Sequence, residues 1–177
     1  MTPRSMTPRR PRKGNGVKVR GFFRIHLVEQ DGRISGDSDW VENMVTNLGK
    51  RDYLCTPLAG GTAKSIAFMA LGTGSTVLSN DTALLGEISH STAASRCRVA
   101  VTTQQFGSSA IEFQATFASS WTSYVTTTVA IQNIMVINNT TSAGTIFAGS
   151  TFAVSTLNTN RPSQPMVDED ALVPLAA

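Results

Sequence analysis

A chain of 177 residues with 41% hydrophobic content is long enough for one domain around a single core. It contains no apolar run near the roughly 18 residues that cross a bilayer, and no signal-peptide core follows its basic N-terminus, so we expect neither a membrane-embedded nor a signal-peptide-secreted protein. Its two cysteines, Cys55 and Cys97, lack disulfide-framework and metal-site spacing and are expected to be buried thiols.

The net charge of +3 conceals a strong asymmetry along the chain. Eight basic residues precede the first acidic residue, Glu29, which leaves seven basic against 12 acidic residues, a charge of −5, for the rest. The eight are Arg4, Arg9, Arg10, Arg12, Lys13, Lys18, Arg20 and Arg24. They predict a cationic N-terminal segment on a mildly acidic body.

Residues 1–16 are predicted to form a disordered arm, because they contain three prolines, clustered positive charge and no large aliphatic side chain beyond two methionines. Basic side chains on a flexible tether neutralise phosphates without fixed geometry, so the eight basic residues are the candidate nucleic-acid contacts. A merely solubilising terminus is the alternative. With all eight engaged on a single strand, the log–log salt slope of binding would be about −5 to −6.

The folded body is predicted to begin with a β-hairpin. Apolar and polar residues alternate over Val17–Val28, and Asp31-Gly32 favours a tight turn into a return strand over Ile34–Val41. We expect Trp40 to pack this hairpin onto the body, with exposure at a subunit contact as the alternative.

A single short helix is predicted within Asn43–Leu58. Thr46 or Asn47 is a suitable cap, the apolar residues follow a helical stripe, and Gly60-Gly61 ends it.

The next segment combines a buried strand with turns. Ser65–Leu71 predicts the strand, Gly72–Ser75 a turn, and Asp81–Ile88 one or two helical turns. Arg96 and Arg98 form either a second basic spot or the protection of an edge strand.

The stretch from Arg98 to Thr156 predicts a series of half-buried strands. Between residues 99 and 160 its only charged residue is Glu112, and apolar side chains occupy every second position around Ile111–Phe117. Further strands are predicted over Val99–Val101, Val125–Ile131, Ile134–Ile137 and Ile146–Val154. Short strands at this spacing indicate an antiparallel sandwich or barrel.

The chain therefore divides into a basic arm (1–16), a β domain (17–160) and a C-terminal tail (161–177). The tail combines the acidic triplet Asp168–Asp170 with an apolar end, and it is predicted to be either the last edge strand or an arm that docks on a neighbour.

Sequence motifs for catalysis or metal binding are not found. His26 and His90 have no cysteine or carboxylate at zinc-site spacing, and Gly72-Thr73-Gly74 lacks the lysine of a phosphate-binding loop. The serines form no nucleophile motif, and Glu112 has no second carboxylate on its strand. We expect no enzyme activity, no catalytic or metal site and no cofactor.

Several short segments carry a resemblance to known proteins. Val45–Gly49, Ile66–Gly74, Asp81–Glu87, Ile111–Phe117 and Gly144–Ala148 resemble, in this order, a pattern found in small virion structural proteins, chiefly of bacteriophages. The resemblance implies a non-enzymatic, jelly-roll-like antiparallel β-sandwich that is repeated many times in a particle as a coat, decoration or fibre-associated subunit.

These observations together predict a self-assembling capsid subunit of the virion, assembled in the host cytoplasm, whose arm contacts the packaged genome. Its expected partners are further copies of itself, the viral genome and other virion proteins, and no membrane. A decoration or tail- and fibre-associated protein is the first alternative. A cellular nucleic-acid-binding β-barrel is the second, and it depends on Phe22-Phe23 beside Arg20 and Arg24.

Overall fold

The structure is a computed structural model that describes residues 18–28, 31–88, 98–106, 110–117, 129–140, 144–157 and 166–176. For Lys18, Leu27, Phe106, Val129, Ala130 and residues 153–157 and 166–176 it describes the backbone alone. Five of the eight candidate nucleic-acid contacts, Arg4 to Lys13, lie outside these residues, as do His90, Arg96 and Cys97.

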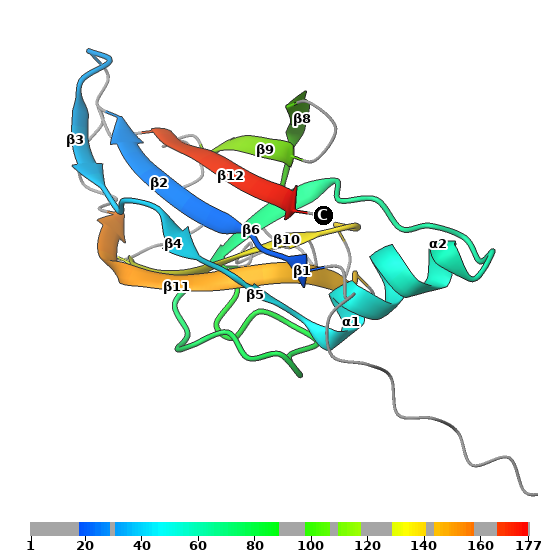
Figure 1. Ribbon diagram of the computed structural model, residues 1–177. Helices are drawn as coiled ribbons and strands as arrows, with labels where there is room; N and C mark the ends of the chain where they lie inside the picture. The colour runs from blue at the N-terminus through cyan, green and yellow to red at the C-terminus, as the bar shows by residue number, and fades with distance from the viewer. Residues whose placement is uncertain are drawn as a thin grey trace, which may run out of the picture.

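The predicted mostly-β fold with one helix is confirmed, and the strands form two antiparallel sheets (Figure 1). The first sheet has the order β3-β2-β12-β9-β8, with β1 paired to β12 and β4 paired to β2. Its strands are β1 (Lys18–Val19), β2 (Phe22–Val28), β3 (Ile34–Asp37), β4 (Val41–Glu42), β8 (Thr102–Phe106), β9 (Ala110–Phe117) and β12 (Met166–Ala176).

The second sheet has the order β5-β11-β10-β6-β7. Its strands are β5 (Met44–Val45), β6 (Phe68–Gly72), β7 (Arg98–Ala100), β10 (Val129–Ile137) and β11 (Ile146–Leu157). One hydrophobic core lies between the two sheets, and it joins Phe23 of β2 and Phe113 of β9 to Ile134 of β10 and Phe147 of β11. The alternation of apolar residues in the sequence thus reflects inward-facing positions.

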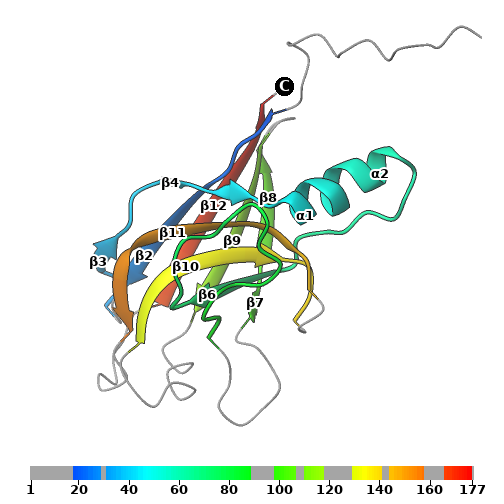
Figure 2. The same cartoon turned by 90° about the horizontal axis from the view of Figure 1, so that it is seen from below.

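The second sheet is buried on its outer face as well. Residues 73–88, here called the covering loop, lie across that face, on the side away from the first sheet (Figure 2). Val77 and Leu84 of the covering loop pack on Ala70, Met135 and Ile146, and all five are buried. A strand that is buried on both faces has a continuous apolar sequence, which explains the run from Ile134 to Ile137 in β10.

The covering loop also replaces the helical turns that we predicted over Asp81–Ile88, so that prediction is wrong. The Asp81 carboxylate accepts a hydrogen bond from the Leu78 N–H, and Gly86 has a positive φ of 67°. The N–H of Ile88 donates to the Leu71 carbonyl, which ties the loop to β6. These contacts with the sheet take the place of local helical hydrogen bonds.

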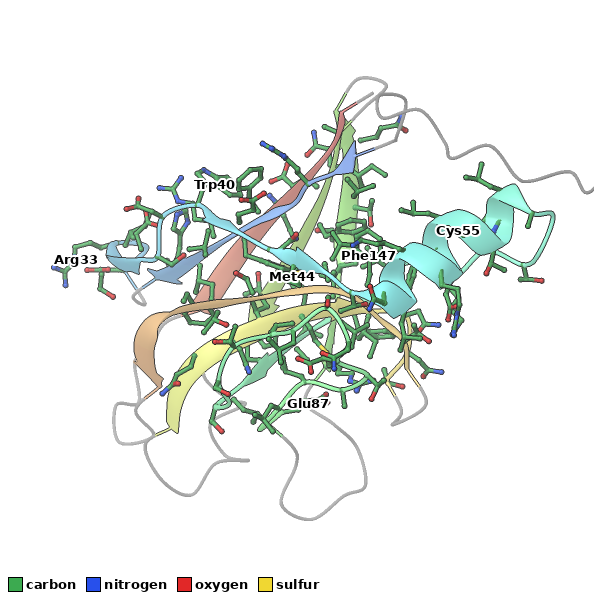
Figure 3. The ribbon with its side chains drawn as sticks, turned by 60° about the horizontal axis from the view of Figure 1, so that its bottom comes forward. Arg33, Trp40, Met44, Cys55, Glu87 and Phe147 are labelled. Atoms are coloured by element: carbon green, nitrogen blue, oxygen red, sulfur yellow. The ribbon has the colours of Figure 1, made fainter. Side chains whose placement is uncertain are left out.

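A buried ion pair closes the covering loop. Arg98 Nε and Nη2 donate to the two Glu87 oxygens at 2.6 and 3.0 Å, and both side chains are 2% exposed. Arg98 Nη1 donates to the Asn139 carbonyl at 2.6 Å. Arg98 is therefore an internal clamp and does not form the basic surface spot that the sequence left open; Figure 3 shows Glu87 below the second sheet.

The predicted helix is confirmed as three consecutive helical segments, α1 (Asn47–Gly49), the π-helical η1 (Lys50–Cys55) and α2 (Thr56–Leu58). Thr46 is the cap: its hydroxyl accepts from the Gly49 N–H and donates to the Ile146 carbonyl, and it is fully buried. The cap thus joins the helix to β11. Cys55 faces outward and is exposed (Figure 3), so the prediction of a buried thiol is wrong there.

A polar network fixes the other side of the helix. The Asp52 carboxylate accepts from Arg51 Nε at 2.5 Å and from Lys64 Nζ at 2.6 Å, and the Tyr53 hydroxyl donates to the Thr145 carbonyl. The hydrogen bonds from Arg51 and then Lys64 lower the pKa of Asp52 to about 2, whereas burial raises the pKa of Tyr53.

Three further boundaries differ from the sequence prediction. The return strand over Ile34–Val41 is interrupted between β3 and β4, where Asp39 has a φ of 55°. The strand predicted over Ser65–Leu71 begins only at Phe68. The two strands predicted within 125–137 are one strand, β10, with a bulge between Ile131 and Asn133.

The predicted C-terminal tail contains β12, which pairs with β2 on one side and β9 on the other. Residues 166–176 are therefore neither an edge strand nor a free arm. The register places Asp168 opposite His26 and Asp170 opposite Arg24, so the acidic triplet lies across from the basic part of β2.

The Glu87–Arg98 pair should be among the strongest single contributors to stability. Glu87→Ala removes the carboxylate from a buried guanidinium, and we expect a loss of about 3 kcal/mol or more in the free energy of unfolding, measured by urea denaturation. Glu42→Ala, which removes an exposed carboxylate, should change it by less than about 0.5 kcal/mol. Equal effects of the two substitutions would contradict the role of the clamp.

The Asp52 network should make stability fall in acid. Because the folded state lowers the pKa of Asp52, its contribution is complete above the unfolded pKa near 4 and disappears as the pH falls toward 2. Urea unfolding at pH 5 and pH 3 should show a steeper decrease for the natural protein than for Asp52→Asn, with a difference of at most about 2 kcal/mol. Parallel decreases would argue against this contribution.

Candidate nucleic-acid interface

Arg24 is held by contacts within the first sheet. Its Nε donates to Asp37 Oδ1 at 3.0 Å and its Nη2 to Asp37 Oδ2 at 2.5 Å, and its guanidinium carbon lies 5.9 Å from the centre of the Trp40 ring. The Arg24 hydrogen bonds hold the pKa of the Asp37 carboxyl well below its usual range. A bidentate pair of this kind already satisfies the charge that a phosphate would neutralise.

The Arg24 guanidinium lies over the ring of Trp40. Trp40 is 41% exposed on the outer side of the β2–β4 region, so it stands at the surface and does not fill the core (Figure 3). Of the two alternatives raised by the sequence, exposure is the one observed. A contact of Trp40 with another subunit remains a prediction.

Arg20 is different from Arg24, because it is exposed and has no ion pair with any described residue. It lies in the interruption between β1 and β2, just after the root of the arm. It lines a cavity of about 550 Å³ together with Lys50, at the start of η1, which is also exposed and without an ion pair within the described chain. Two free cations therefore share one concave site.

The other residues lining this cavity are mixed: Val19, Met44, Val45 and Val77 supply apolar wall, and the rest, apart from Gly149, are polar. Thr76, Ser150 and Thr151 contribute hydroxyl-bearing residues, and Glu42 contributes one carboxylate. Asn43 lines it as well, and its buried amide has no hydrogen-bond partner within the described residues. Cations beside hydroxyl groups suit a phosphate group better than an apolar ligand, although Glu42 reduces the local positive charge.

Sequence reasoning missed Lys50. It is separated from Arg24, the last of the eight N-terminal basic residues, by 25 residues, and its only basic neighbour in the sequence is Arg51, so the tertiary packing of the helix brings it to Arg20. Lys18 lies in β1 opposite Ala176. Among the described residues, the candidate interface therefore consists of Arg20, which follows the predicted arm, and Lys50 of η1.

The aromatic–basic cluster that supported a nucleic-acid-binding barrel is divided between the core and the surface, and Phe22 is only half-buried. Phe23 is 2% exposed in the core and Arg24 is paired with Asp37. Base stacking needs exposed aromatic rings, so β2 offers that function little support.

A second concavity, here called the apolar groove, has a volume of about 340 Å³. It lies where the helix meets the two sheets, and Tyr53, Ile66, Ile111, Phe113 and Phe147 supply most of its wall. Tyr53 and Phe147 pack edge to face there, with ring centres 5.1 Å apart. Lys64 at its margin is engaged by Asp52, so the groove presents mainly apolar surface.

Within the described part of the chain, no three histidine, cysteine, aspartate or glutamate side chains gather in a way that would hold a metal ion. No helix among the described residues is long and apolar enough to cross a bilayer. His26 Nε2 lies 3.4 Å from Asp37 Oδ2, within the Arg24–Asp37 cluster. Comparison of the chain with protein-family models, curated proteins and solved structures finds no match, so the interpretation rests on the sequence and geometry of this chain.

Arg20 and Lys50 should contribute to nucleic-acid binding, whereas Arg24 should contribute to stability. For Arg20→Gln/Lys50→Gln we expect the log–log salt slope for a single-stranded oligonucleotide to become shallower by about 1.4, because two phosphate contacts are lost. Arg24→Gln should lower the midpoint of thermal unfolding and leave the slope nearly unchanged.

Arg33→Gln is the control for the loss of one positive charge, since Arg33 is exposed on the β2–β3 turn away from the cavity. Binding would be followed by fluorescence anisotropy at several salt concentrations. If Arg33→Gln made the slope shallower by about 0.7, as much per charge as the double substitution, binding would follow overall charge and the interface would be misplaced.

Proposed function

We propose that this chain is a virion structural protein, a self-assembling capsid subunit whose basic N-terminal arm contacts the packaged genome. The observation that carries the proposal is the segregation of charge. Eight basic residues precede the first acidic residue, and residues 99 to 160 include one charged residue. The cavity lined by Arg20 and Lys50 lies close to the point where the predicted arm joins the folded body.

The folded body suits repeated self-contact. We infer a sandwich of the jelly-roll type for the two sheets, which share one core and hold each other rigid. Uncharged strands let many copies approach without mutual repulsion, and weak contacts repeated by symmetry close a particle. The subunit would be assembled in the host cytoplasm and carried in the virion.

The arm would couple assembly to packaging. Each arm would contribute several charge-assisted phosphate contacts, and binding of many arms to one nucleic acid would raise the local concentration of subunits. The described cations at its root would continue this contact onto the folded body. No catalytic step and no cofactor belong to this role.

A decoration or tail- and fibre-associated protein is the second candidate, and β12 favours it. Residues 166–176 are built into the first sheet between β2 and β9, so they are not free to reach across to a neighbouring subunit. A body that is complete in this way is also suited to binding an existing shell or a host surface.

The two candidates predict different products of purification. A capsid subunit should form uniform closed particles in negative-stain microscopy, and the same sizing-column peak should show a raised 260/280 nm absorbance ratio. Nucleic-acid-free monomers or trimers would contradict the capsid proposal and favour decoration or fibre attachment.

The role of the arm can be tested with a truncation that ends just before β1. Deletion of residues 2–17 keeps β1, which pairs with β12, so the body should fold and assemble but lose most of its nucleic acid. Retained nucleic acid with an unchanged salt dependence would show that the arm is not the contact. Circular dichroism and thermal unfolding would confirm that the truncated body is folded.

A further inference from the structure

The four edges of the two described sheets are not equally protected. On the β3–β4 side, Asp37, Asp39 and Glu42 bring charge, and the edge is interrupted at Asp39. In the second sheet, β5 pairs with Ala148 and Gly149 of β11, the neighbouring Ser150 and Thr151 side chains hydrogen-bond to Glu42 and Val77, and β7 has three residues. Short, broken or charged edges are the usual means by which proteins prevent strand addition.

The fourth edge, β8, has none of these features. Its sequence, Thr-Thr-Gln-Gln-Phe over Thr102–Phe106, contains no charge, proline or glycine, and it pairs with β9 over all five residues without a register shift. Residues 102 to 105 are all exposed. It is a regular, uncharged strand at the margin of the first sheet (Figure 1).

The β8 strand also extends beyond the second sheet. Thr103 lies opposite Phe113, on the core-facing side of the first sheet, and yet it is exposed. It borders the apolar groove, whose wall includes Ile111 and Phe113 of β9. A strand added to β8 would therefore lie beside exposed residues of this strand and next to the apolar groove.

We propose that β8 pairs antiparallel with β8 of a second copy about a two-fold axis, so that two seven-stranded sheets become one. Antiparallel pairing of identical strands is self-complementary, and the threonine and glutamine side chains meet without charge repulsion and can hydrogen-bond across the junction. The choice of a second copy as the partner rests on the proposed self-assembly. The exposure of β8 and its lack of charge are observations that do not depend on that proposal.

Charge exchange at this edge tests the pairing. Thr102 and Thr103 lie opposite the uncharged Gln114 and Phe113 of β9, so Thr102→Lys/Thr103→Lys and Thr102→Glu/Thr103→Glu bring like charges close together in a two-fold pair without facing a charged residue of β9. We expect each variant alone to self-associate about tenfold more weakly or worse, and an equimolar mixture of the two to recover association. Thr62→Lys/Ala63→Lys, an equal charge change at exposed positions after the helix, should associate like the natural protein.

Sedimentation velocity over a range of concentrations would measure association, and circular dichroism would verify folding. Natural association by both variants, or weakened variants that the mixture does not restore, would overturn the β8–β8 pair while leaving self-assembly intact. Dimers that respond to charge exchange but never form particles would support the pair and contradict the capsid role. A natural protein that stays monomeric would overturn both.

Discussion

Burial of the second sheet on both faces is the constraint on which the remaining structure depends. The first sheet covers one face, but the other needs the covering loop, a segment with little secondary structure of its own. Two polar devices hold this loop in an apolar setting. The Asn133 amide donates to the carbonyls of Ser75 and Leu85, and the Glu87–Arg98 pair closes its end. Burying such donors without acceptors is costly, so the hydrogen bonds of the Asn133 amide nitrogen and of Arg98 favour one position of the loop, whereas Asn133 Oδ1 has no hydrogen-bond partner among the described residues.

Ion pairs within the body also determine which basic side chains remain available for binding. Arg98, Lys64 and Arg24 each engage a carboxylate, so they contribute to the cohesion of the body. Arg20 and Lys50 are the described cations that face a cavity without such a partner. The described body therefore has a small basic site beside Arg20 and Lys50, and an exposed, uncharged strand edge at β8. Both features are consistent with the proposed subunit, which would bind nucleic acid at one surface and another copy of itself at the other.

The errors in the sequence interpretation share one cause. A helix over Asp81–Ile88 and a surface role for Arg98 were reasonable from local pattern, but contacts with distant strands overrode both. The tail at 166–176 has an interrupted alternation because of its acidic triplet, and nothing local shows that it enters the middle of a sheet. Lys50 was missed for the same reason, since its proximity to Arg20 arises from packing.

The sequence by itself determined the mostly-β class, the hairpin at Asp31-Gly32, a helix capped at Thr46 or Asn47 and the cationic character of the N-terminal segment, because periodicity, turn chemistry, capping and charge are local properties. The tertiary structure alone decided strand order, the covered outer face, which arginines are neutralised and which edge stays open. These depend on contacts between residues far apart in the chain, such as Thr46 with Ile146, whose free energy leaves no periodic trace in the sequence.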